Sequence, residues 1–313
     1  ARRQRQMCIR DRIWVSSFLK REEAEDIRGM LHDNALPFTT GSQIVSALML
    51  GLQEAFDREK ILLLFDAASH PNEEVKVRAL ISILITLYTY RKRTQLYPQI
   101  ADRLAALAET PGFIKTIRTI ILRFILARET EKITRKLQDE IIPEMLKLSP
   151  KLSKKINLNE LTPEDLTGNE MNPEWESFFS DSTLGKKMVE FGELQQEGAD
   201  VMHSTFVHLK NFPFFHELSN WLLPFTIEHS YFDDQFTPDN EAEKQMLDSM
   251  TFAAFMCNSD KYSLYFSMMQ LPKEARKMMM NQFDSQATEM IQQNKEELIS
   301  KRGKQDTIIG QYI

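Results

Sequence analysis

The chain has 313 residues, a formal net charge of −6 and a mean hydropathy of −0.37. This acidic balance disfavours nucleic acid and anionic membranes as partners, because both attract basic surfaces. Glycine is scarce and apolar residues recur at spacings of three and four rather than two, so the sequence predicts an all-α protein with no sheet.

The first twelve residues look foreign to the rest of the chain. Arg2–Arg12 is the translation of a common transposon-based sequencing-library adapter, which all eleven residues match. We therefore expect residues 1–12 to be an artefact that makes no specific contacts with the fold. The alternative, a basic tail with a nucleic-acid or targeting role, explains only the charges. Without Cys8, Cys257 stands alone and no disulfide can form within the chain, so we expect a cytoplasmic protein.

Residues 13–148 are expected to form three pairs of antiparallel helices. Each pair is interrupted by a break, at Leu36–Pro37, at Pro71 and at Thr110–Gly112. The first pair is expected at 21–34 and in a stretch that starts within 39–44. The second pair is expected at 57–70 and 75–88, and the third at 97–109 and in a stretch from 113.

The middle pair has the most distinctive sequence. Pro71 ends its first helix, and Asn72 can cap the second helix, which then opens with two acidic residues. The second helix is apolar on nearly every side, so it must be covered by neighbours on more than one face. The unit resembles a HEAT repeat, and this resemblance rests on Pro71, Glu73, Glu74, Val77, Arg78 and Ala79.

Aligning the second helices places Val45, Val77 and Ile117 in equivalent positions, at spacings of 32 and 40 residues. Such spacings are typical of two-helix solenoid units, which stack and form a concave surface. The HEAT resemblance implies that Arg78 and Arg118, which fall at matching positions, face inward or form a ladder. The alternative is that they solvate a helix edge or pair with nearby acids.

The rest of the chain is expected to form an ordered connecting segment at 149–182 and a second helical lobe at 183–313. Small residues every seven positions in the first helix of this lobe, Gly185, Gly192 and Ala199, favour close helix packing over a hinge. The aromatic segment 211–225 is expected to be buried. It resembles a region of bacterial helical-repeat proteins that precedes tetratricopeptide-like pairs, so the lobe is expected to be tetratricopeptide-like or irregular.

Further helices are expected in this lobe at 241–256, 260–270 and 273–301. Nine Met residues between Met246 and Met290 are interpreted as core filling rather than as an adaptable binding groove. We expect apolar residues near 13–19 and from 290 onward to be exposed, because further repeats would normally cover them.

The sequence contains no recognisable catalytic or metal-binding constellation. His203 and His208 are five residues apart, about 140° around a regular helix, so they cannot share a metal. His229 with Asp233 and Asp234 is the nearest approach to a ligand set, and it is better explained as an ordinary acidic loop. Cys257 is expected to be a small buried hydrophobe rather than a nucleophile. We therefore expect no cofactor, no metal and no catalytic residue.

These observations favour a non-enzymatic helical-repeat scaffold that binds an unidentified protein partner and neither nucleic acid nor membrane. The alternative is a HEAT-fold enzyme of the alkyl-base DNA glycosylase type, since that fold does host such chemistry. The acidic composition disfavours the enzyme, because a groove that handles DNA needs a basic stripe.

Overall fold

A computed structural model describes residues 10–33, 35–136, 139, 210–226, 247, 250, 251, 256–270 and 301–313. The regular structure within these residues is helical and includes no strand, which confirms the all-α prediction. The chain divides into two compact units, one of Ala1–Leu122 with Leu209–Ile313 and one of Arg123–His208. The expected connecting segment and the domain boundaries beside it lie outside the described residues. None of the described helices has the length and apolarity needed to cross a bilayer.

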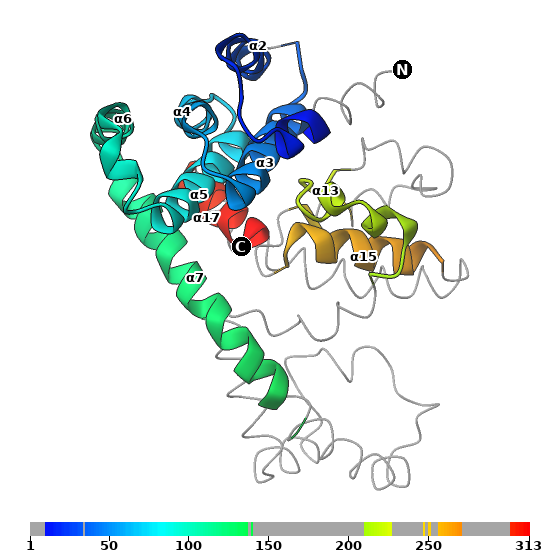
Figure 1. The fold of residues 1–313 in the computed structure, drawn as a ribbon. Coiled ribbons are helices and arrows are strands. Elements are labelled where there is room, and N and C mark those ends of the chain that lie inside the picture. The colour runs from blue at the N-terminus through cyan, green and yellow to red at the C-terminus, as the bar shows by residue number, and fades with distance from the viewer. Residues whose placement is uncertain are drawn as a thin grey trace, which may run out of the picture. The chain divides into compact units, whose positions relative to one another are not determined.

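The three predicted helix pairs are all present (Figure 1). Their breaks fall where proline or glycine was expected to end a helix. The helices are α2 (Arg21–His32) with α3 (Phe38–Glu54), α4 (Arg58–Ala67) with α5 (Glu73–Thr89), and α6 (Pro98–Ala108) with α7 (Phe113–Lys136).

Local sequence explains where these helices begin. The side chain of Asn72 accepts the backbone N–H groups of Glu74 and Val75 and so caps α5, as predicted. Asp57 caps α4 in the same way. Gly112, just before α7, has a φ of 83°, a left-handed conformation that side chains with a Cβ rarely adopt.

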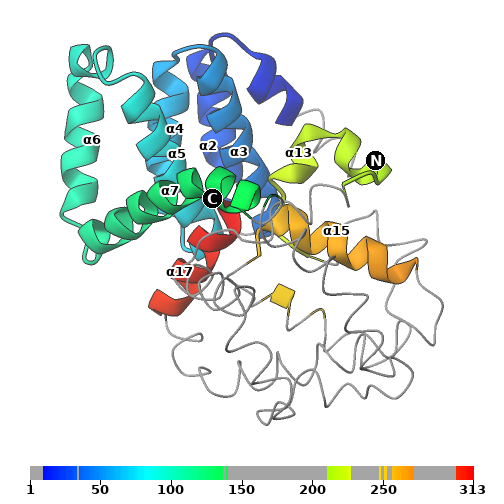
Figure 2. The same cartoon turned by 90° about the horizontal axis from the view of Figure 1, so that it is seen from below.

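The pairs stack in layers within the first unit. The first helices form one row in which α4 contacts both α2 and α6, and the second helices α3 and α5 pack beside each other (Figure 2). Buried Asp66 of α4 joins the first row, because its carboxylate pairs with Arg28 of α2 at 2.7 Å and with Arg103 of α6 at 3.2 Å. Val77 and Ala79 are fully buried in α5, as the repeat interpretation predicts.

Residues 10–19 belong to this unit, which corrects two expectations. Arg12 pairs with Glu23 at 2.7 Å, and Arg10 donates a hydrogen bond to Ser219, so residues 10–12 do make specific contacts. Ile13 and Leu19 are buried, and only Val15 and Phe18 of the apolar side chains at 13–19 are strongly exposed.

Buried polar groups explain why this segment is fixed. The backbone N–H of Leu19 donates to Asp57 at 2.6 Å, and Lys60 Nζ donates to the carbonyl of Ser16 at 2.6 Å. Gly51 makes room for this lysine, since a Cβ at that position would overlap Nζ. The capping residue of α4 and one side chain within it therefore hold the segment in place.

Residues from the C-terminal part of the chain complete the unit. They form η3 (Pro213–His216), α13 (Leu218–Trp221), α15 (Asn258–Met269) and α17 (Lys301–Tyr312). Phe214, Phe215 and Phe225 are buried, and the rings of Phe214 and Phe225 contact Tyr262 of α15. The prediction of a core role holds for these three residues, whereas Trp221 in the same segment is 38% exposed.

Helix α17 begins at the residue where the last expected helix, 273–301, was predicted to end. It packs on α5, while α13 contacts both α3 and α15. Ile309 in α17 is fully buried, so the expectation that apolar residues from 290 onward are exposed is wrong at this position.

Candidate functional site

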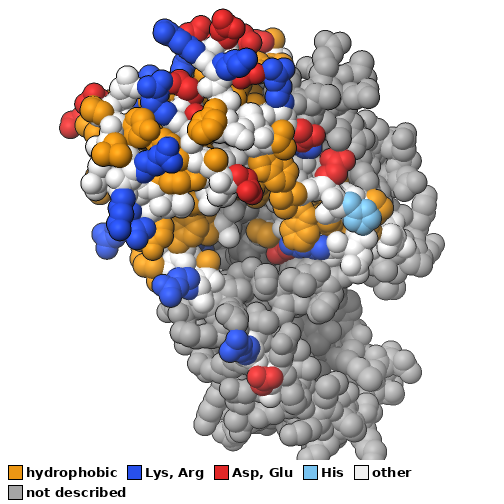
Figure 3. Space-filling model, in the orientation of Figure 1, with side chains coloured by type: hydrophobic (Ala, Val, Ile, Leu, Met, Phe, Trp, Pro, Cys, Tyr) orange, Lys and Arg blue, Asp and Glu red, His pale blue; other side chains and the backbone are white. Residues whose placement is uncertain are grey.

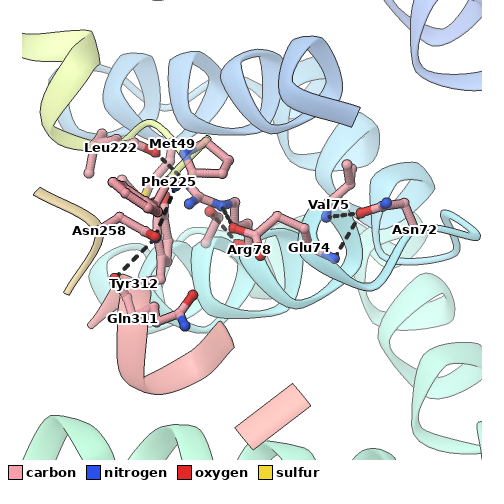
Figure 4. Close-up of polar contacts among 12 residues, drawn as sticks. Met49, Asn72, Glu74, Val75, Arg78, Leu222, Phe225, Asn258, Gln311 and Tyr312 are labelled. Atoms are coloured by element: carbon pink, nitrogen blue, oxygen red, sulfur yellow. Dashed lines mark hydrogen bonds and ion pairs between the residues drawn. The ribbon is translucent and has the colours of Figure 1, made fainter. Parts of the chain in front are cut away.

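A buried arginine lies at the centre of the first unit. The side chain of Arg78 is completely buried on α5 (Figure 4). Its Nε donates to Glu74 Oε1 at 2.7 Å, and its Nη1 donates to the carbonyl of Leu222. The guanidinium also lies over the ring of Tyr312, 4.2 Å from the centroid. One residue of α5 therefore contacts both the segment after α13 and the last helix.

The arginine belongs to a larger set of buried polar groups. Asn258 accepts the backbone N–H of Phe225 at 3.0 Å and donates to the carbonyl of Gln311 at 3.2 Å. The hydroxyl of Tyr262 donates to the carbonyl of Pro224 at 2.7 Å and accepts the N–H of Thr226. These bonds join α15, α17 and the loop 222–226.

Burial controls the ionisation of this cluster. It lowers the pKa of Lys261 to about 7, although the nearby Glu74 carboxylate raises it. Burial also raises the pKa of Tyr262 far above its usual range. Lys261 Nζ donates to the carbonyl of Thr251 at 3.2 Å. Arg78 Nη2 is buried and makes no hydrogen bond in the described part of the chain.

The polar atoms of this cluster point into the interior of the unit, so the cluster serves to pack the helices together. It shows that the chain's own helices occupy one side of the second-helix row, since α13 contacts α3 and α17 contacts α5. Gln305 of α17 adds a hydrogen bond to Glu73 at 2.7 Å. Helices α3 and α5 therefore already contact other helices of the same chain on this side.

A hollow of about 400 Å³ lies beside the turn between α4 and α5. It is lined by Met30, Phe38, His70, Pro71 and Asp33, among others. His70 Nδ1 accepts the backbone N–H of Asn72 at 3.0 Å, and burial lowers the pKa of His70. Asp33 accepts the N–H of Ala35 at 2.9 Å. Both titratable groups are engaged with nearby backbone, so the hollow presents no assembled acid and base.

Helix α7 differs from the other second helices because its outer face is open. Ile114 is 70% exposed, Ile121 43% and Leu122 49%, whereas Ile120 is fully buried. Lys115 and Arg118 are exposed beside them, and residues 113–122 include no acid. At about 100° per residue, these five side chains share one side of the helix, opposite Ile120. We call this set, Ile114, Lys115, Arg118, Ile121 and Leu122, the α7 face.

The α7 face combines apolar and basic character. Figure 3 shows hydrophobic and basic side chains side by side over α6 and the first part of α7. No ion pair between described residues involves Lys115 or Arg118. Contiguous exposed apolar residues of this kind mark interaction sites more often than random surface.

The alignment of the second helices explains why the two arginines differ. Arg78 and Arg118 occupy matching positions, but the residue four positions earlier is Glu74 in α5 and Ile114 in α7. Arg78 is buried, as the HEAT resemblance implies, and it pairs with Glu74 of its own helix, as the alternative interpretation expected. Arg118 has no carboxylate within one helical turn and is exposed, as the alternative interpretation expected.

The remaining predicted positions are less informative. His203, His208 and the set His229, Asp233 and Asp234 lie outside the described residues. Burial raises the pKa of the Cys257 thiol to about 11, with a further increase from Asp260, which agrees with an inert cysteine although the residue is only half-buried.

Met250 and Met256, which precede α15, and Met268 within it are buried, so the prediction of a core role holds for these three methionines. Among the described residues, no three His, Cys, Asp or Glu side chains gather as a metal site would require. In comparisons with known proteins, no family model, curated protein or solved structure matches this chain.

Proposed function

We propose that the chain is a non-enzymatic helical-repeat scaffold and that the α7 face binds a protein. The observation that carries the proposal is the exposure of Ile114, Ile121 and Leu122 around Arg118, which forms no ion pair with any other described residue. Exposed Ile and Leu on a regular helix favour burial against another apolar surface. A cation between them favours a partner with carboxylates.

The character of the buried polar groups supports a structural role for the interior. Glu74 and Arg78 are paired with each other, and the hydroxyl of Tyr262 is bound to backbone. A catalytic acid or base must reach a substrate within hydrogen-bond distance. These groups instead hold together segments that are far apart in the sequence.

A photo-crosslinking amino acid at position 121 tests the proposal in cells of the source organism. We expect a discrete protein adduct at Ile121 and none at Gln99, an exposed position on α6 that serves as the control. Arg118→Glu should abolish the adduct, since it replaces the cation with a like charge for a carboxylate partner.

Two outcomes would contradict the scaffold proposal. One is the absence of any protein adduct at both Ile114 and Ile121. The other is a hydrolase, transferase or glycosylase activity of the purified chain that disappears when a single carboxylate is replaced.

A further inference from the structure

A second surface of the same unit has the features that would complement the α7 face. Val15 is 74% exposed and Phe18 is 70% exposed, directly before α2. Helix α2 then presents exposed Glu22 and Asp26. Glu25 is also exposed and pairs with Arg21 at 3.2 Å within the helix. We call Val15, Phe18, Glu22, Glu25 and Asp26 the α2 edge.

The other charges of α2 are already engaged inside the unit. Glu23 pairs with Arg12, and Arg28 pairs with buried Asp66. The free charge on the exposed side of α2 is therefore negative, and Glu22 and Asp26 lie in none of the ion pairs between described residues. On the α7 face the free charge is positive, from Lys115 and Arg118.

We propose that the α7 face of one copy binds the α2 edge of a second copy, so that the protein associates head to tail. This inference rests on the proposed function and names the partner of the same face. Ile114, Ile121 and Leu122 would cover Val15 and Phe18, while Lys115 and Arg118 would pair with Glu22 and Asp26. Both the apolar surfaces and the charges are then satisfied by residues of one chain.

Other occupants fit these observations less well. Clusters of four to eight basic residues are typical of proteins that bind anionic membranes, whereas the α7 face has two in a chain of net charge −6. An unrelated acidic helix would satisfy Arg118, but it would leave Val15 and Phe18 exposed. The second copy accounts for both open surfaces.

The contact uses two different surfaces of each copy, which has a consequence for assembly. In an open head-to-tail assembly one face and one edge stay free at the ends, whereas a rotation that brings the two ends together closes a ring. Assembly should continue to larger species as the concentration rises, and salt should weaken it.

Charge reversal in the full chain provides the test, with sedimentation velocity between about 1 and 200 μM at low and high salt. We expect wild type to grow in mass with concentration. Lys115→Glu with Arg118→Glu should weaken association about tenfold or more, and so should Glu22→Lys with Asp26→Lys, because like charges then face each other. The matched controls Arg91→Glu with Lys92→Glu, and Asp102→Lys with Glu109→Lys, change the net charge equally outside both surfaces. They should associate like wild type.

Mixing the two disrupted variants is the decisive step. Each retains one intact surface, so the mixture should associate more strongly than either variant does alone. A monomeric wild type at 200 μM, unchanged association of either variant, or a mixture that stays monomeric would each overturn the second-copy proposal. So would wild-type monomers that bind phosphatidylserine vesicles through Arg118.

The sedimentation and crosslinking results together distinguish the head-to-tail proposal from the scaffold proposal. A monomeric chain whose Ile121 crosslinks to a different protein contradicts head-to-tail association and leaves the scaffold standing. A monomeric chain with no adduct contradicts both.

Discussion

Helices α5 and α7 are the second helices of adjacent pairs, and each has an arginine at the same aligned position, yet one helix is enclosed and the other is open. α5 contacts α3, α4 and α17, and Arg78 is buried among them. α7 buries Ile120 and leaves Arg118 and its apolar neighbours exposed. The aligned position therefore fixes where a side chain lies on its helix, and later segments of the chain decide whether it is buried.

The largest effect should come from placing a charge inside α5. Val77 is fully buried, so Val77→Asp puts a carboxylate where no cation or water can compensate it, at a cost of about 4 kcal/mol or more. Chemical denaturation should show that the cooperative unfolding transition moves to a much lower denaturant concentration or is lost. Ile114→Asp on the α7 face is the control and should change stability by less than about 0.5 kcal/mol. Equal effects of the two substitutions would refute the difference between the helices.

The second-largest difference should appear when the two arginines are replaced and the free energy of unfolding is compared. Arg78→Ala removes the ion pair with Glu74, the bond to Leu222 and the contact with Tyr312, and we expect a loss of about 3 to 5 kcal/mol. Arg118→Ala should stay within about 0.5 kcal/mol.

A double variant sharpens this measurement. Arg78→Met with Glu74→Leu leaves no unpaired charge, so it should be more stable than Arg78→Ala. A cost below about 1 kcal/mol for Arg78→Ala would contradict the buried position of the guanidinium.

Local sequence was enough to predict the three helix pairs and the cap at Asn72. Proline, glycine and capping residues act within a few positions, so they can be recognised in the sequence. The environment of Arg78 could not be predicted in the same way, because its partners are distant in the sequence. Leu222 is 144 positions away, and Tyr312 belongs to α17 near the other end of the chain. One local signal was present, since Glu74 precedes Arg78 by one turn and Ile114 takes its place before Arg118.

Burial around α5 should also make stability depend on pH. The pKa of Lys261 is about 7 in the folded state and 10.5 when the side chain is unperturbed, so the unfolded chain binds more protons between these values. The free energy of unfolding should therefore rise with pH, by at most about 1.4 kcal/mol per unit. The useful window is pH 7 to 9, because above it the unfolded Cys257 thiol, whose ordinary pKa is 9.0, ionises while the folded thiol does not, and this offsets the rise.

Lys261→Met should flatten this slope, and Lys115→Met on the exposed α7 face should leave it unchanged. Urea unfolding at several pH values provides the measurement. A slope that survives Lys261→Met would show that another group is responsible.

The smallest difference should lie at the beginnings of the two helices. α5 starts with a side-chain cap, in which Asn72 Oδ1 accepts the N–H of Glu74 at 2.9 Å, so Asn72→Ala should cost about 1 kcal/mol. Asn72→Asp keeps the acceptor and should restore most of the loss. α7 starts after Gly112 at a φ of 83°, so Gly112→Ala should cost about 1 to 2 kcal/mol through backbone strain, with no neighbour in the way of the new methyl group. Thermal melts of the three variants separate these causes: if Asn72→Asp is as unstable as Asn72→Ala, the cap is not what begins α5.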